Sequence, residues 1–295
     1  MKYVFFGSPR FAAIILGSLI EAGMPPVALV CNPDRPVGRK QIITPPLTKQ
    51  EIFEAAERSG VSSAITILQP EKLDERFIEH LRALAPDFFI VAAYAKIIPQ
   101  AVLDIPLLGT LGTHPSLLPK YRGASPIQSA LLAGDAITGT TLYAMDAKMD
   151  HGAIYAQREW PIAQGTNYLS LEAQLAALSA DTLIKVIPDF YAGKLTPQEQ
   201  DESRATFTKK FVTQDGFVDE KDLEDATGKN SGADTNSDEE KARTIFNKIN
   251  ALNPEPGCWT IRDGKRTKLL EAQINIHGSL KLLVIQEEGQ KPKRL

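Results

Sequence analysis

Residues 1–23 read MKYVFFGSPRFAAIILGSLIEAG, and this stretch decides the fold class. The apolar run YVFF predicts a short strand and the glycine behind it a turn, while Ser8 and Pro9 predict the capped start of a helix. The apolar residues that come next fall on one helical face: Phe11, Ile14, Ile15 and Leu19. Strand, turn and helix together are the first unit of an α/β sheet.

The same alternation of strand and helix continues along the chain. Further buried strands are expected at residues 27–31, 65–68, 87–94 and 107–114, and helices at residues 49–60 and 74–84. Residues 137–146 and 153–162 predict two antiparallel strands, and an amphipathic helix from residue 168 closes the unit near residue 190. Such alternation implies right-handed crossovers and a mostly parallel sheet.

The pattern changes in the last third of the chain. We expect a catalytic domain over residues 1–190, a linker over 191–205 and a small β-rich domain over 206–295, with hairpin turns at RDGK and HGS. Residues 219–240 hold nine acids and two lysines, so they carry −7, although the whole chain is only −3. Within them, residues 225–238 have almost no apolar side chains and are expected to be a disordered insertion.

Composition and motifs exclude several classes of protein. No charged leader with an apolar run opens the sequence and no stretch approaches 18 apolar residues, so neither a signal peptide nor a membrane span is expected. Cys31 and Cys258 are too few for a zinc site, and we expect a reduced cytoplasmic protein without metal. GSPRFA departs from GxGxxG, and neither GxSxG nor a Walker A sequence occurs, which argues against dehydrogenases, serine hydrolases and P-loop enzymes.

Candidate site residues gather at expected strand ends. Open α/β sheets bind ligands at the carboxyl ends of their strands, where Gly7, Tyr94, His114 and Asp146 are expected. His114 is one of four histidines and stands between a strand and a proline-rich turn. Asp150 follows a strand that we expect to end in the same region, and a carboxylate beside an imidazole makes a positioned acid or oxyanion donor.

Two long motifs around these residues identify a family. HPSLLPKYRGASPIQ (114–128) and TGTTLYAMDAKMDHG (138–152) resemble the signature of the 10-formyltetrahydrofolate-dependent formyltransferases. The resemblance implies a Rossmann-like formyltransferase domain followed by an OB-like β-barrel. Because an OB barrel needs about five strands and we count three or four, the second domain is expected to be reduced or incomplete.

Four more stretches resemble the methionyl-tRNA branch of that family: VFFGSPRFA (4–12), NPDRPVGRKQIITPP (32–46), FTKKFVTQDGFVD (207–219) and INALNPEPGCWTIRDGKRTKLLEA (249–272). This branch transfers a formyl group from 10-formyltetrahydrofolate to the α-amino group of methionine on initiator tRNA. The resemblance therefore implies a one-carbon transferase of translation initiation, with the folate as co-substrate and initiator tRNA as partner, without a metal or a membrane. We expect a monomer.

The resemblance assigns residues to three roles. His114 and Asp150 take the histidine and aspartate positions of the catalytic centre. The residues implied in folate binding are Ser116, Leu117, Leu118, Pro119, Tyr94, Ile97, Ile98 and Asp146. For the leucines and isoleucines, ordinary core packing is an equal alternative. Residues 32–48, with four prolines and no periodicity, predict a long loop, and the basic residues expected to meet the tRNA are Arg35, Arg39, Lys40, Lys209 and Lys210.

Gly112 departs from the family pattern, which is Asn-x-His where this chain has Gly-Thr-His. Residues i and i+2 of a strand face the same side, so position 112 lies beside His114 but offers no side-chain donor. Losing one oxyanion donor costs about 10²–10³ in rate, and restoring the asparagine is expected to raise turnover unless the glycine needs a positive φ. Thr110, on the same face, is a candidate substitute donor.

Two alternatives to the methionyl-tRNA reaction stay open. One is a formyltransferase that acts on a nucleotide-linked amino sugar. The other is a non-catalytic RNA- or folate-binding relative, which the glycine at position 112 suggests. Formyl transfer from the folate to charged initiator tRNA, to free methionine or to an amino sugar nucleotide distinguishes the three.

Overall fold

The computed structural model describes residues 1–38, 40–59, 65–228 and 235–295. The chain divides into two compact units. The first unit is Met1–Gly123, Thr138–Trp160 and Glu172–Phe207, and the second is Ala124–Ile137, Pro161–Leu171 and Thr208–Leu295. The boundaries expected at residues 190 and 206 stay predictions.

The described part of the first unit is built on a sheet of seven strands in the order β10-β9-β7-β6-β1-β2-β5. The five strands from β7 to β5 are parallel, which confirms the predicted mostly parallel sheet, and β9 is antiparallel to β7. The strands are β1 (Tyr3–Phe6), β2 (Ala28–Val30), β5 (Thr66–Leu68), β6 (Phe88–Ala92), β7 (Thr110–His114), β9 (Ile137–Ala144) and β10 (Ile154–Pro161).

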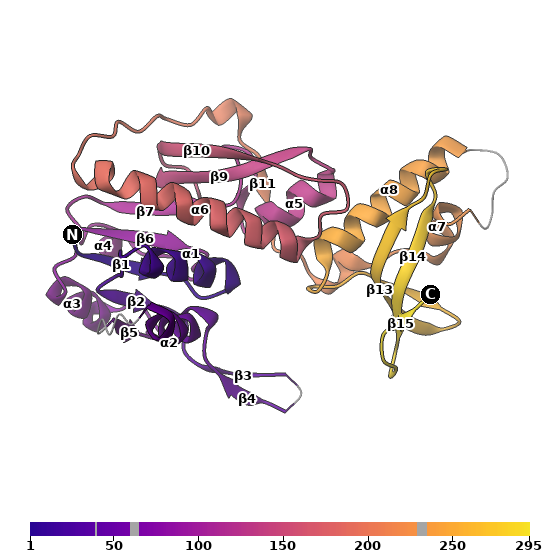
Figure 1. Ribbon diagram of the computed structural model, residues 1–295, viewed down its shortest axis with the longest axis horizontal. Coiled ribbons are helices and arrows are strands. Elements are labelled where there is room, and N and C mark those ends of the chain that lie inside the picture. The colour runs from indigo at the N-terminus through magenta and orange to yellow at the C-terminus, as the bar shows by residue number, and fades with distance from the viewer. Residues whose placement is uncertain (39, 60–64, 229–234) are drawn as a thin grey trace. The chain divides into compact units, whose positions relative to one another are not determined.

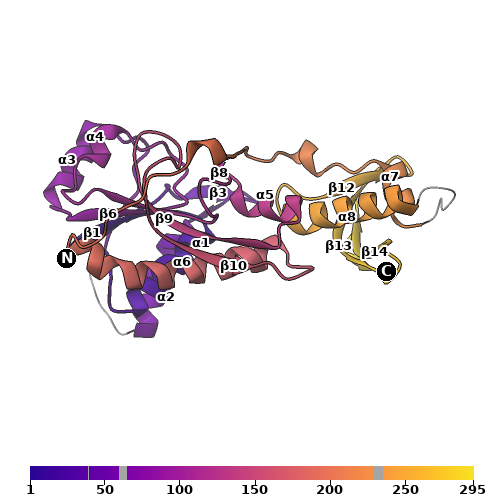
Figure 2. The same cartoon turned by 90° about the horizontal axis from the view of Figure 1, so that it is seen from above.

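Helices cover both faces of this sheet. Figures 1 and 2 show α1, α2 and α6 over one face and α3 and α4 over the other. The bounds are α1 (Arg10–Glu21), α2 (Leu47–Ser59), α3 (Glu75–Ala83), α4 (Gln100–Leu103) and α6 (Tyr168–Tyr191). Ser8 does not cap α1 as predicted, because Pro9 takes the N-cap position and the Ser8 hydroxyl accepts a hydrogen bond from the Asn32 amide at 2.9 Å. None of the described helices combines the length and the apolar character that crossing a bilayer requires.

The central strands are buried on both faces. All residues of β1 and of β6 are buried, and Tyr3 stacks on Phe88 with ring centroids 5.3 Å apart. Phe6 packs against Phe89 at 5.1 Å. A strand that is covered on both sides can be apolar at every position, which is why YVFF and FFIVA are continuous apolar runs. The core thus holds the strands whose ends carry the candidate site.

The expected loop over residues 32–48 is a hairpin in the structure. β3 (Arg35–Val37) pairs antiparallel with β4 (Ile42–Thr44), and both strands are largely exposed. The four prolines did not prevent pairing, because Pro36 lies in a two-stranded sheet where every strand is an edge. Figure 1 shows the hairpin projecting from the end of the unit that carries β2 and α2.

The second unit contains a separate antiparallel sheet. Its strands in the described residues follow the order β12-β13-β14-β15: β12 (Trp259–Arg262), β13 (Lys265–Ile274), β14 (Leu280–Glu287) and β15 (Lys293–Arg294). Both predicted hairpin turns are confirmed, since Arg262 pairs with Lys265 and Ile274 with Leu280. The sheet confirms a small antiparallel second domain, whereas an OB-like barrel stays a prediction.

Helices α7 (Glu220–Ala226) and α8 (Thr235–Leu252) pack on this second sheet, and α5 (Pro126–Ala133) packs on α8. They correct one expectation. The predicted disorder over 225–238 is wrong at both ends, because α7 includes Asp225 and α8 begins at Thr235; residues 229–234 lie outside the described residues. Lys241 ties the two helices together through Asp222 at 3.0 Å and Asp225 at 2.6 Å. The two helices also share a hydrophobic cluster that includes Leu223, Ala226, Ala242 and Ile245.

Candidate active site

The candidate site lies where the strand order of the first sheet reverses. The chain runs outward from β1 to β2 and β5 and then returns to β6 on the other side of β1. Open α/β sheets bind ligands at the carboxyl ends of the strands beside such a reversal. Gly7 follows β1, Tyr94 lies two residues past β6 and His114 ends the neighbouring β7, so the structure brings these predicted residues to one edge.

Asp146 and Asp150 arrive at this edge by an unexpected route. The sequence suggested that their strand ends beside His114, but β9 is antiparallel to β7 and its last residue, Ala144, pairs with Leu111. The loop that follows folds back, so the Asp150 carboxylate reaches the other end of β7. Asp150 has a φ of 49°, which is the left-handed conformation that such a reversal requires of its backbone.

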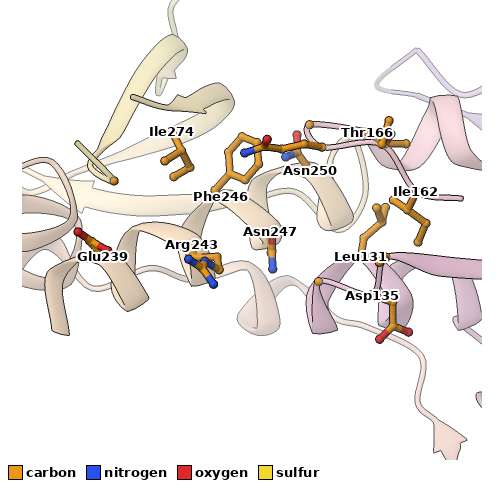
Figure 3. A pocket seen from close by; sticks show the side chains of 16 residues that line it. Leu131, Asp135, Ile162, Thr166, Glu239, Arg243, Phe246, Asn247, Asn250 and Ile274 are labelled. Atoms are coloured by element: carbon orange, nitrogen blue, oxygen red, sulfur yellow. The ribbon is translucent and has the colours of Figure 1, made fainter. Parts of the chain in front are cut away.

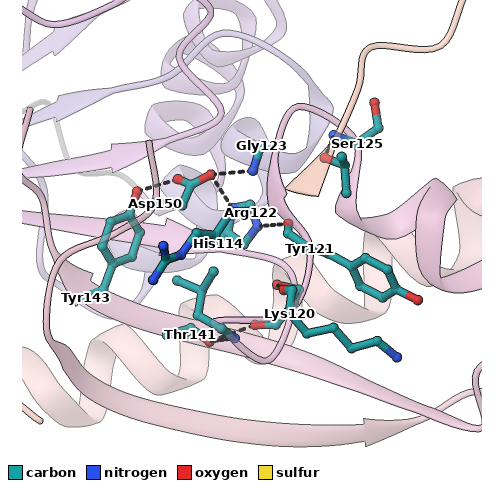
Figure 4. A network of polar contacts seen from close by, with 12 residues as sticks. His114, Lys120, Tyr121, Arg122, Gly123, Ser125, Thr141, Tyr143 and Asp150 are labelled. Atoms are coloured by element: carbon teal, nitrogen blue, oxygen red, sulfur yellow. Dashed lines mark hydrogen bonds and ion pairs between the residues drawn. The ribbon is translucent and has the colours of Figure 1, made fainter. Parts of the chain in front are cut away.

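His114 and Asp150 face each other in a buried setting (Figure 4). Asp150 Oδ2 lies 3.6 Å from His114 Nδ1, and the exposed fractions of the two side chains are 7% and 16%. His114 Nε2 lies 2.8 Å from the carbonyl oxygen of Tyr121. A carbonyl oxygen only accepts, so Nε2 carries a hydrogen and Nδ1 is the atom that can gain or lose a proton. The proton-exchanging nitrogen therefore points at the carboxylate.

The carboxylate of Asp150 is held on both of its oxygens. The backbone amide of Gly123 donates to Oδ2 at 2.7 Å, and the hydroxyl of Tyr143 donates to Oδ1 at 2.7 Å. Burial and the charge of Asp150 raise the pKa of Tyr143 well above its ordinary value, so this hydroxyl keeps its proton. Tyr143 was not predicted as a site residue. Its β9 position was visible in the sequence, but its contact with Asp150 was not.

Tyr143 also explains the unusual glycine. Gly112 pairs directly with Tyr143 across β7 and β9. A Cβ atom on Gly112 would lie 2.4 Å from Tyr143 Cε1 and 2.9 Å from Met145 Cγ, closer than van der Waals contact allows. Gly112 is not among the residues with positive φ, so space and not backbone conformation requires the glycine. The tyrosine ring occupies the space that an asparagine at position 112 would need. The expected rise in turnover from Gly112→Asn therefore has no structural basis.

The turn behind His114 is tied to the segment that follows α6. Arg122 has a side chain only 2% exposed, and its guanidinium donates to Gln200 Oε1 at 2.7 Å and pairs with Glu202 at 2.6 Å. Gln200 in turn donates to the carbonyl oxygens of Asp150 and Gly152 at 2.9 and 2.8 Å. The predicted linker thus braces both the histidine turn and the Asp150 loop, a role that sequence spacing does not reveal.

The predicted folate turn, residues 116–119, is half buried and is held by hydrogen bonds to Thr141. Ser116 and Leu118 are 1% and 3% exposed, whereas Leu117 and Pro119 are partly exposed. Thr141 accepts from the Leu118 amide at 3.1 Å and donates to the Ser116 carbonyl oxygen at 2.7 Å. Side chains of Ser116 and Leu118 therefore shape the turn from within, and partly exposed Leu117 and Pro119 are the ones able to meet a ligand.

The remaining predicted folate residues lie in different surroundings. Tyr94 packs on Phe6, and its buried hydroxyl has no hydrogen-bond partner among the described residues. Ile97 is 93% exposed, while Ile98 belongs to the core cluster around Val102 and Leu103. Asp146 is engaged elsewhere: its carboxylate accepts from the Lys148 amide at 2.8 Å and lies 2.7 Å from His151 Nδ1.

The predicted tRNA-contacting cations are on exposed surfaces. Arg35 pairs with Glu71 at 2.5 Å, yet 62% of its side chain stays exposed, and Lys40 is exposed at the hairpin turn. Arg39 lies outside the described residues. Lys209 pairs with Asp215, and Lys210 is exposed beside it. Lys209 and Lys210 belong to the second unit, whereas the hairpin belongs to the first.

A cavity of about 360 Å³ lies within the second unit, apart from all these residues (Figure 3). Its lining combines the end of α5, the segment before α6 and the exposed face of α8, with Asp135, Thr166 and Arg243 among the polar side chains. None of the predicted catalytic or folate-contacting residues lines it. The candidate site is therefore the Asp150–His114 region of the first unit.

Sequence comparison gives matches over both parts of the chain. The formyl transferase family matches residues 1–187, and the formyl transferase C-terminal domain matches residues 239–289. The methionyl-tRNA formyltransferase of Halorhodospira halophila is 39% identical over 257 residues, which cover 87% of this chain and 74% of that protein.

Solved structures match the fold. HypX from Aquifex aeolicus, solved in complex with tetrahydrofolic acid, superposes with a TM-score of 0.63 at 18% identity and covers all of this chain, which spans 46% of HypX. Methionyl-tRNA formyltransferase from Clostridium thermocellum superposes with a TM-score of 0.58 at 14% identity, covering 97% of this chain and 98% of that one. At these identities the likeness establishes the fold.

Proposed function

This chain belongs to the formyl transferase family, and from that membership we propose that it transfers a formyl group from 10-formyltetrahydrofolate to the amino group of methionyl-initiator tRNA. The first unit performs the transfer, and the basic surfaces of both units meet the tRNA. The proposed acceptor is a substrate of translation initiation, which implies a cytoplasmic enzyme. We propose that it acts as a monomer.

The reaction requires positioned proton donors and acceptors and no protein nucleophile. The amine nitrogen bonds to the formyl carbon while negative charge develops on the formyl oxygen. The bond between the formyl carbon and the folate nitrogen then breaks, and a proton moves from the amine to that nitrogen. A carboxylate and an imidazole that share a proton supply this transfer.

The observation that carries the proposal is the geometry of His114 and Asp150. Nε2 of the histidine donates to the Tyr121 carbonyl oxygen, which leaves Nδ1 and the carboxylate, 3.6 Å apart, as the atoms that move a proton. Asp150 is prevented from turning away by the Gly123 amide and the Tyr143 hydroxyl. Preorganised groups of this kind stabilise the transition state more than mobile groups do, because they need no reorganisation when the charge develops.

A folate pocket beside this pair is supported by Tyr94. A buried hydroxyl without a partner costs free energy, so its retention points to a bound group that completes the hydrogen bond. We propose that the pterin binds past the ends of β1 and β6, against Tyr94 and Ile97, and meets Leu117 and Pro119 of the adjacent turn. In this arrangement the buried side chains of Ser116, Leu118 and Ile98 do not contact the pterin but hold the backbone around it in place.

The test is transfer of labelled formyl from 10-formyltetrahydrofolate by the purified chain, with three acceptors compared at equal concentration. Charged initiator tRNA should accept the label at least about 100-fold faster than free methionine or a nucleotide-linked amino sugar. Faster transfer to the amino sugar would replace this proposal with that acceptor. Absence of transfer to every acceptor, with folate still bound, would identify a non-catalytic relative.

A further inference from the structure

Gly112 and Tyr143 are complementary in shape. They are direct partners in the register of β7 and β9, and the tyrosine ring lies across the place where a side chain at position 112 would begin. The contact involves Cε1 and Cζ, at 2.4 and 2.5 Å from the added Cβ, so no rotation of the hydroxyl alone relieves it. A ring at 143 and a side chain at 112 therefore exclude each other in this backbone.

The tyrosine brings a donor with it. Its hydroxyl, on a side chain that is 4% exposed, reaches past Gly112 to Asp150 Oδ1 at 2.7 Å. Oδ2 of the same carboxylate accepts from Gly123 and faces His114. A hydroxyl that donates to a carboxylate fixes the rotamer of that carboxylate. The hydroxyl thus restrains the carboxylate through Oδ1, while Oδ2 stays facing His114 Nδ1.

We propose that Tyr143 is a positioning residue of the formyl-transfer site, which fills the space vacated at Gly112 and holds Asp150 toward His114 in place of a side chain at position 112. This inference rests on the proposed function. Because the hydroxyl proton points at Asp150, Tyr143 acts through that carboxylate. The glycine and the tyrosine are two halves of one substitution, so neither can be changed alone without loss.

The first experiment removes only the hydroxyl, with Tyr143→Phe. Turnover of formyl transfer to charged initiator tRNA should fall about 10- to 100-fold, while the KM values for folate and tRNA stay within about twofold. Tyr155→Phe is the matched control, because Tyr155 packs on Phe190 and should leave kcat unchanged.

Two results of this experiment overturn the proposal. One is a Tyr143→Phe turnover within twofold of the wild type. The other is a fall in turnover that comes with a lower melting temperature and raised KM values, which is the result of a merely structural role. If the wild type itself transfers no formyl group to any acceptor, the proposed function fails first and this inference falls with it.

The second experiment tests the pairing of the two residues. Gly112→Asn alone should lower both melting temperature and turnover, because the new side chain meets the tyrosine ring. Tyr143→Leu alone should lower turnover by removing the donor. The turnover of the double variant should be about tenfold or more above the value expected if the two single effects simply multiplied. Its melting temperature should return toward that of the wild type. Additive effects, or a faster Gly112→Asn enzyme, would contradict the pairing.

Discussion

Arg122 and Arg35 each pair with a glutamate, and comparing them shows what separates the turn after His114 from the hairpin. Arg122 in the turn after His114 is 2% exposed and pairs with Glu202, whereas Arg35 in the hairpin is 62% exposed and pairs with Glu71. Both glutamates are exposed, 58% for Glu202 and 64% for Glu71, so the difference lies in the arginines: Arg122 is buried and also donates to Gln200 Oε1, whereas Arg35 lies in solvent. The first pair is suited to holding catalytic groups still, and the second leaves a cation accessible to a phosphate.

The largest expected effect is at the carboxylate that the braced turn holds. Asp150→Asn keeps the shape of the side chain but removes the carboxylate that lies 3.6 Å from His114 Nδ1. Turnover should fall by two or more orders of magnitude while the dissociation constant for folate changes by less than about threefold. Turnover is measured by formyl transfer and folate binding by titration. A variant with near-normal turnover would show that the rigidity of this region serves something other than catalysis.

The next effect separates the two arginines by stability. Arg122→Met should lower the free energy of unfolding by about 2–3 kcal/mol, because Gln200 Oε1 loses its buried partner. Arg35→Met should stay within about 0.5 kcal/mol of the wild type, as expected for an exposed pair. Urea unfolding of both variants measures the difference. Equal losses would mean that burial does not distinguish the two regions.

A smaller effect is expected on the affinity for tRNA, and it should appear when cations of the hairpin are removed. Arg35→Ala and Lys40→Ala should each weaken tRNA binding roughly two- to fivefold and reduce the slope of log affinity against log salt by about 0.9 for each phosphate that is no longer neutralised. Lys194→Ala is the control, because this exposed lysine pairs with Asp189 at the end of α6. Unchanged affinity and slope in the hairpin variants would make it an ordinary solvated surface.

The smallest effect concerns pH. The hydrogen bond from Arg122 lowers the pKa of Glu202 below its ordinary value of 4.5. The pair therefore contributes stability above pH 4.5 and loses it as the pH falls through the lowered pKa. Wild type and Glu202→Gln should therefore differ in melting temperature near pH 6, begin to converge below pH 4.5 and coincide once the pH is below the lowered pKa. Glu71→Gln, at the hairpin, should show little difference throughout. A Glu202→Gln difference that persists at low pH would contradict the electrostatic origin.

The parts of the fold that the sequence predicted are those governed by local pattern. The buried strands are apolar runs in the sequence, and RDGK and HGS contain residues that suit hairpin turns. The hairpin was missed because prolines argue against strands, although RPV and IIT pair at an edge that needs few backbone donors. Helix α8 was missed behind its acidic start, although Ala242, Ile245, Ile249 and Leu252 have helical spacing and are buried.

In the site, the histidine and the aspartate could be predicted, but their supports could not. Tyr143 acts through its register with Gly112, and a strand register is fixed by pairing between segments 31 residues apart along β7 and β9. Arg122 is braced by residues about 80 positions later. Such contacts depend on the tertiary fold, and nothing in the local sequence signals them. The sequence showed that Gly112 departs from the family pattern, but only its contact with Tyr143 in the structure explains why a glycine is needed there.

The measurement that tests the central claim most directly is single-turnover formyl transfer to methionyl-initiator tRNA by His114→Ala at saturating folate. The rate should be at least about 100-fold below that of the wild type, with folate and tRNA binding preserved, because the proton-exchanging Nδ1 opposite Asp150 is gone. A His114→Ala rate within a few-fold of the wild type would contradict the assignment of catalysis to this pair.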